Sequence, residues 1–182
     1  MRIISKMSVR IAAGAGLFMA AIYVSAQEYK PDTPGKNDMF PWPAGKTVAV
    51  SLTFDDARLS QADRGIPLLD RYDVKGTFYI SPENLKQRTD AWNKASLNGH
   101  EIGNHSILHP CSGNFDWSRT KALEDYTMEK MAAEIDSATR LIKTLFGKEP
   151  VSFAYPCGQT FIGRGTATKS YVPLVASMFE TG

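Results

Sequence analysis

Short apolar runs alternate along the chain with longer segments in which apolar residues recur every three or four positions. The short runs predict buried strands at residues 47–52, 76–80, 101–104 and 151–154, and the first two are rich in β-branched and aromatic residues. The longer segments predict amphipathic helices at residues 61–72, 91–97 and 128–146. Strands that alternate with helices in this way favour an α/β fold built on a parallel sheet.

The segment 128–146 has the clearest helical pattern. Its apolar residues form one stripe, and Gly147 stands where the helix would end, because glycine readily adopts the left-handed conformation of a helix C-cap. The preceding residues 110–125 are rich in Ser, Asn and Asp and are expected to form a loop. Phe115 and Trp117 in this loop either stack on sugar rings or anchor the loop itself.

Two polar clusters follow predicted strands. Asp55 and Asp56 come after the first strand; by itself, such a pair is more typical of a solvated turn or a helix N-cap. His105 and His109 come after the third strand, four residues apart, a spacing that zinc sites use repeatedly. Because parallel strands would end at one edge, the clusters are expected to meet, and two imidazoles with one carboxylate would leave a coordination position open for water. The remaining histidine, His100, is interpreted as structural.

Three motifs resemble those of the polysaccharide deacetylases of carbohydrate esterase family 4. They are TFDD at residues 53–56, GHEIGNHSILHP at 99–110 and FAYPCG at 153–158, and the resemblance covers residues 47–158. It implies a distorted (β/α) barrel of about seven units. The third motif usually begins with Arg in this family, whereas Ala154 stands there in this chain.

The resemblance also implies a mechanism. Asp56, His105 and His109 would hold a divalent metal ion, with zinc expected, and the ion would activate water and polarise an N- or O-acetyl carbonyl on a sugar. Asp55 would act as the base, and the backbone amide of Cys157 would stabilise the oxyanion. In relatives the missing Arg orients the free carboxylate, so Ala154 leaves the protonation and position of Asp55 open.

The function predicted from these motifs is therefore metal-dependent removal of acetyl groups from a polysaccharide. Xylan, chitin, peptidoglycan and other acetylated glycans are all compatible substrates. A secreted, inactive carbohydrate-binding relative that retains the metal site is the alternative. A serine esterase is less favoured, because the chain has no Gly-x-Ser-x-Gly motif and Ser106 lies between the two expected histidine ligands.

The first 26 residues have the pattern of a signal peptide. Three basic residues precede an apolar stretch at residues 11–24, and Val-Ser-Ala at 24–26 resembles a cleavage site, which predicts export to the periplasm or the extracellular space. A permanent membrane span is less favoured because the stretch is shorter than the roughly 20 residues a span requires. Removing residues 1–26 changes the formal charge from +2 to −1, since three of the 21 Lys and Arg and none of the 19 Asp and Glu are lost. This charge does not favour a nucleic-acid partner.

The predicted organisation places a Pro- and Gly-containing leader at residues 27–46 before a deacetylase domain at 47–182. Within the leader, Trp42 is expected to have a packing role, with a glycan-stacking surface as the alternative. The mature chain of 156 residues is shorter than the roughly 200 residues or more of a complete barrel. We therefore expect a domain truncated after about four to five strands.

Two further expectations concern catalysis and the cysteines. In the family, a His from a C-terminal motif protonates the leaving group, but no His follows His109, which predicts little activity for this chain. Cys111 and Cys157 are the only cysteines. In an exported protein they are expected to form a disulfide at the rim that bears the metal ligands, with two separate buried thiols as the alternative.

Overall fold

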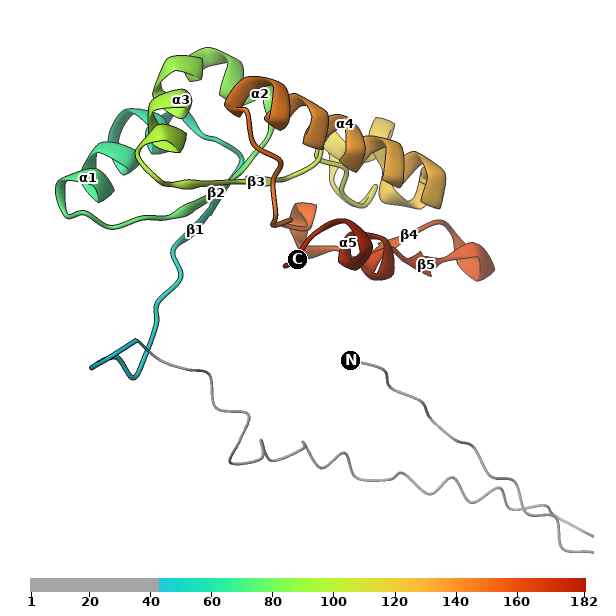
Figure 1. Ribbon diagram of the computed structural model, residues 1–182. Coiled ribbons are helices and arrows are strands. Elements are labelled where there is room, and N and C mark those ends of the chain that lie inside the picture. Colours follow the sequence, from blue (N-terminus) through green and yellow to red (C-terminus); the bar gives the residue numbers. More distant parts are fainter. Residues whose placement is uncertain (1–42) are drawn as a thin grey trace, which may run out of the picture. The chain divides into compact units, whose positions relative to one another are not determined.

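The computed structural model describes residues 43–182, of which residues 48–182 form one unit (Figure 1). The predicted signal peptide, most of the leader and Trp42 lie outside the described residues. In the described part of the chain, no helix is long and apolar enough to cross a membrane.

Three parallel strands form the sheet that positions the candidate site. They are β1 (Thr53–Asp55), β2 (Thr77–Ile80) and β3 (Glu101–Asn104), in the spatial order β1-β2-β3. Thr53 pairs with Thr77, and Thr77 pairs with Glu101, so the three strands run in register. Their C-terminal ends therefore meet at one edge, as the sequence predicted.

Helical segments connect these strands. A π-helical turn (Gln61–Gly65) continues into α1 (Ile66–Arg71) between β1 and β2, and α2 (Pro82–Leu85), a 3₁₀ turn (Lys86–Arg88) and α3 (Thr89–Leu97) follow β2. In Figure 1 these helices lie over the strands. The apolar residues of the helices and strands form a first core cluster, which includes Phe78, Trp92 and Ile102. The alternation of strands and helices confirms the α/β class.

Helix α4 (Met128–Phe146) joins this first core cluster to a second one. The Thr127 side chain caps its N-terminus by accepting a hydrogen bond from the backbone of Lys130, and Gly147 ends the helix with a φ of +70°. Ile142 packs in the first cluster, whereas Met131 and Ile135 pack in the second. The predicted bounds of this helix are therefore confirmed. Its apolar residues pack in both core clusters.

The C-terminal part of the chain completes the second core cluster. Two short 3₁₀ segments (Asp116–Lys121 and Leu123–Asp125) interrupt the expected loop before α4, and a further one (Pro156–Gly158) forms the end of the third motif. A hairpin of β4 (Phe161–Ile162) and β5 (Lys169–Ser170) and then α5 (Val172–Met178) come last, with one 3₁₀ turn (Gly165–Ala167) inside the hairpin. The sequence analysis did not predict this hairpin.

The buried strand predicted at residues 47–52 is wrong. Val48 and Val50 have exposed fractions of 73% and 81%, and the strand begins only at Thr53. The pairing with β2 starts at Thr53, and no described strand lies along the other edge of β1. Among the described residues, the apolar side chains of residues 48–52 therefore have no neighbouring strand to pack against.

The strand predicted at residues 151–154 is present only in part. Phe153 forms an isolated parallel bridge with Asn104, and Ser152 forms one with Thr181. The described strands do not close into a barrel, so the barrel and its truncation stay predictions from the family resemblance.

Candidate metal centre

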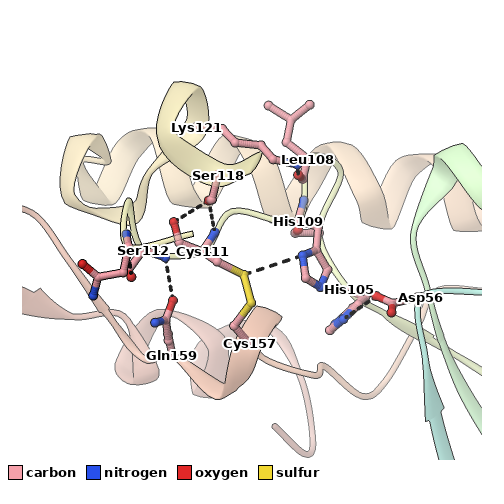
Figure 2. The surroundings of a disulfide bond; sticks show 12 residues. Asp56, His105, Leu108, His109, Cys111, Ser112, Ser118, Lys121, Cys157 and Gln159 are labelled. Atoms are coloured by element: carbon pink, nitrogen blue, oxygen red, sulfur yellow. Dashed lines mark hydrogen bonds and ion pairs between the residues drawn. A yellow bond between two sulfur atoms is a disulfide. The ribbon is translucent and has the colours of Figure 1, made fainter. Parts of the chain in front are cut away.

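Three potential metal ligands converge where β1 and β3 end. Oδ1 of Asp56 lies 3.3 Å from Nε2 of His109 and 3.6 Å from Nε2 of His105, and Figure 2 shows these side chains together. One potential ligand atom from each residue lies within 4.8 Å of the other two. Ligands about 2.0–2.2 Å from a tetrahedral ion are themselves about 3.3–3.6 Å apart. The donor set and its spacing therefore fit a divalent ion such as zinc.

Two different features favour a neutral imidazole with a free nitrogen for a metal ion at His105 and at His109. His105 is buried, and its Nδ1 lies 2.8 Å from the carbonyl oxygen of Ala154. Because a carbonyl can only accept, Nδ1 of His105 carries the proton and Nε2 is free to face Asp56. Burial, followed by the proximity of His105, lowers the pKa of His109, which favours the neutral form that can bind a metal.

The ligands sit on backbone turns with positive φ, a conformation that is uncommon for residues other than glycine. The φ angles are 76° at Asp56, 62° at Ser106 and 50° at His109. The Asn84 side chain donates to the Asp56 carbonyl oxygen over 2.9 Å, and Oδ1 of Asn104 accepts from the Ser106 amide over 2.8 Å. Polar side chains thus hold both turns in conformations that cost free energy by themselves.

The histidine-bearing loop is attached to α4 by two buried polar side chains. The side-chain amide of Asn104 donates over 3.0 Å both to the Ile135 carbonyl oxygen and to the Thr139 hydroxyl. Oε1 of Glu134 accepts hydrogen bonds from the backbone amides of residues 107 and 108. Helix α4 therefore fixes the path of the loop between the two histidines.

Asp55 lines a cleft of about 660 Å³ together with the three ligands. Its backbone carbonyl oxygen accepts a 2.7 Å hydrogen bond from the Gln61 side chain. Its carboxylate is exposed and forms no hydrogen bond or ion pair with another described residue. Ala154, at the position of the family's Arg, supplies no charge to this carboxylate.

Cys157 also lines the cleft and forms the predicted disulfide with Cys111, with 6.0 Å between their Cα atoms (Figure 2). Its φ of 56° belongs to a tight turn after Pro156. Sγ of Cys111 lies 3.7 Å from Nδ1 of His109. Because both sulfurs are in the disulfide, they are not thiolate ligands in this state, and the pairing instead links the histidine loop to the third motif.

The sequence analysis missed Arg58, which contacts a candidate ligand, and Glu134, which holds the loop between the two histidines. Nη2 and Nε of Arg58 donate to Oδ2 of Asp56 over 2.9 and 3.2 Å, on the other side of the carboxylate from the histidines. Arg58 follows the TFDD motif by only two residues, and this proximity was the available signal. Glu134 was detectable as a charged residue within the buried stripe of α4, three positions after Met131.

Two further expectations concerned His100 and the aromatic pair Phe115 and Trp117. His100 is structural, as predicted: its Nδ1 accepts from the Gly76 amide over 3.1 Å, and its Nε2 lies 3.1 Å from Asp70. Trp117 stacks against Phe115 with ring centroids 5.6 Å apart and also lines the cleft, so both anchoring and sugar stacking stay open.

Comparisons with known proteins identify several relatives of this chain. Peptidoglycan-N-acetylmuramic acid deacetylase PdaA of Bacillus subtilis is 26% identical over 122 residues, which are 66% of this chain and 42% of that protein. Peptidoglycan-N-acetylglucosamine deacetylase PgdA of Listeria monocytogenes is 34% identical over 70 residues, which are 37% of this chain and 15% of that protein. The chain spans less than half of the length of these curated relatives.

The solved structure of the Streptococcus pyogenes deacetylase PplD in complex with acetate has the same fold. It superposes with a TM-score of 0.58 at 18% identity, covering 78% of this chain and 56% of that one. A mutant described as a CE4 family pseudoenzyme superposes with a TM-score of 0.53 at 22% identity, covering 72% and 42% of the two chains. The family model for polysaccharide deacetylases matches residues 43–170, and the chain therefore belongs to the polysaccharide deacetylase family.

Proposed function

We propose that this protein hydrolyses acetyl groups on a polysaccharide with the help of a divalent metal ion, for which zinc is the expected identity. The observation that carries this proposal is the convergence of Asp56, His105 and His109 on one cleft, with ligand atoms spaced for a single ion. A divalent ion bound there would supply a Lewis acid and make water a stronger nucleophile at neutral pH.

The residues around the ligands would act as the base and as the hydrogen-bond donor to the oxyanion. Asp55, exposed in the cleft and outside the ligand set, would take the proton from the attacking water. The backbone amide of Cys157, held by the disulfide and by the turn after Pro156, would donate to the oxyanion that forms from the acetyl carbonyl. Arg58 would hold the Asp56 side chain in place through the ion pair with Oδ2.

An exported, acetylated glycan is the substrate class that fits best. Two of the relatives, PdaA and PgdA, are deacetylases of peptidoglycan, which favours N-acetyl groups on a cell-wall glycan. The predicted signal peptide would place the protein in the periplasm or outside the cell, where such glycans lie.

Acetate release from peptidoglycan, chitin and acetylated xylan, measured with zinc-loaded protein, tests the activity. We expect this chain to release acetate only slowly, because no His follows His109 to protonate the leaving group. Asp55→Asn should abolish this slow release while zinc remains bound, whereas His105→Ala and His109→Ala should each lose most of the bound zinc. Stoichiometric zinc in the protein with both histidines replaced would overturn the ligand assignment.

An inactive carbohydrate-binding role is the second candidate. It is favoured by Ala154, which leaves Asp55 without the charged partner that orients this carboxylate in relatives. Bound zinc with no acetate release from any of these glycans would support it. Substituting Ala154→Arg in the same protein would then be expected to raise the acetate release above the background.

A further inference from the structure

The disulfide lies against one of the candidate metal ligands. Figure 2 shows the His109 ring between the Cys111–Cys157 bond and Asp56. Sγ of Cys111 lies 3.7 Å from Nδ1 of His109, and the other ring nitrogen, Nε2, faces Asp56. One potential ligand atom from each of His109, Cys111 and Cys157 lies within 4.8 Å of the other two. His109 therefore belongs to two groups of potential ligands, and the second group contains two sulfur atoms.

The spacing of the second group fits a tetrahedral ion once the sulfurs are thiols. Nitrogen and sulfur ligands about 2.1 and 2.3 Å from such an ion are themselves about 3.6 Å apart. The distance from Nδ1 of His109 to Sγ of Cys111 is close to this value. Cys157 is exposed on the turn Pro156–Gly158, where its side chain can rotate away from Cys111 after the bond is broken. A small side-chain movement would therefore complete the site.

Hydrogen bonds hold the two cysteine segments together independently of the disulfide. The Cys111 amide donates to the Ser118 hydroxyl over 3.0 Å, and this hydroxyl donates to the Cys111 carbonyl oxygen over 2.7 Å. The Ser112 amide donates to Oε1 of Gln159 over 2.7 Å, which joins the residue after one cysteine to a residue two positions after the other. Breaking the disulfide therefore leaves the two thiols and the imidazole side by side.

We propose that reduction of the disulfide creates a second metal site, in which Cys111, Cys157 and Nδ1 of His109 bind one thiophilic ion such as zinc. A dithiol would supply the two electrons: its own thiols form a disulfide, and the Cys111–Cys157 bond becomes two thiols. Each of these thiols releases its proton to the solvent as the ion binds. Thiolate and imidazole ligands favour zinc and softer ions over magnesium and calcium.

The two metal sites compete for His109. A neutral imidazole has one free nitrogen, because the other carries the proton. In the site with Asp56, Nε2 binds the ion, whereas in the sulfur site Nδ1 binds it and Nε2 carries the proton, facing Oδ1 of Asp56 at 3.3 Å. An ion at the sulfurs thus removes one of the three ligands of the other site. Reduction would thereby switch off the hydrolysis, a consequence that rests on the proposed function.

Cobalt(II) tests the sulfur site without any turnover, because thiolate ligands give this ion a near-ultraviolet charge-transfer band. We would titrate the protein with Co²⁺ before and after reduction by a water-soluble phosphine. The band should appear only after reduction, with one ion per chain. Reduced His109→Ala should bind cobalt at the sulfurs about tenfold more weakly, since one of three ligands is lost. Reduced Asp56→Asn, which alters only the other site, should show the band with at least the affinity of the parent protein.

The protein with both Cys111→Ser and Cys157→Ser is the control and should show no band before or after the same treatment. Circular dichroism of each sample reports whether the fold persists. Unfolding of the parent protein on reduction, absence of the band from the reduced protein, or equal cobalt affinity in the parent and His109→Ala would each overturn the proposal. Sulfur-bound cobalt in the reduced protein, together with no acetate release by the oxidised, zinc-loaded protein, would retain the second site and refute the hydrolytic function.

Discussion

At the scale of single residues, the Asp56 carboxylate has two different partners. Oδ1 faces the histidines, and Oδ2 accepts both hydrogen bonds from Arg58. Because Arg58 orients the carboxylate, we expect Arg58→Ala to weaken zinc binding about tenfold, the lower end for groups that position metal ligands. Arg58→Lys keeps the charge but loses the two-pronged contact and should be intermediate.

Competition with a chromophoric chelator would measure these zinc affinities. Arg64→Ala is the matched control, since Arg64 is exposed on the π-helical turn and forms no hydrogen bond or ion pair with Asp56. Tighter zinc binding by Arg58→Ala would contradict the orienting role and show that the guanidinium competes with the ion.

A second residue-scale prediction concerns Asp70. The hydrogen bond from Asn98, followed by that from His100, lowers the pKa of the Asp70 carboxyl below its usual value. A lowered folded-state pKa stabilises the protein above the unfolded-state value of about 3.9, and this contribution is lost as the pH falls through the folded-state pKa. Urea unfolding between pH 2 and 6 should show a smaller acid-induced loss of stability in Asp70→Asn. Asp73→Asn, at a side chain that is 94% exposed, should leave the pH profile unchanged.

At the scale of elements, α4 supports the histidine-bearing loop. Glu134 is 8% exposed, and it satisfies two backbone amides between the histidines. Glu134→Ala should lower the free energy of unfolding by about 2–3 kcal/mol, because two buried donors would lose a charged acceptor. It should also weaken zinc binding, because the loop that carries both imidazoles would be less constrained.

Urea unfolding and zinc titration of the same protein would test this coupling. Asp136→Asn on the exposed side of α4 removes a surface ion pair with Arg140 and should change stability by less than about 1 kcal/mol. If Glu134→Ala lowered stability but left zinc affinity unchanged, α4 would support the fold without positioning the ligands.

At the scale of the whole molecule, the disulfide ties together segments 46 residues apart in sequence. Replacing both Cys111 and Cys157 by Ser should lower the free energy of unfolding by about 4 kcal/mol, since closing a loop of this length restricts the unfolded chain. Urea unfolding without reductant would measure the loss. Wild-type protein treated with a reductant should become about as unstable as the double variant, and equal stability of all three samples would contradict the prediction.

The sequence by itself determined the features that depend on local patterns. The bounds of α4 follow from its apolar spacing and from Gly147, because helix periodicity and capping involve residues a few positions apart. The candidate ligands were also predictable, since an Asp pair after a strand and two histidines four residues apart have a recognisable chemistry. The parallel register of β1, β2 and β3 brought these clusters together as expected.

Only the tertiary structure decided which residues are buried and which contact residues distant in sequence. The run at residues 48–52 has the composition of a buried strand but is exposed, because burial of a strand depends on partners distant in sequence. Arg58 and Glu134 became candidate site residues only when folding placed them against the Asp56 carboxylate and the histidine loop. Contacts between distant segments leave no periodic signal in the chain, so the sequence could specify the candidate ligands but not the residues that hold them.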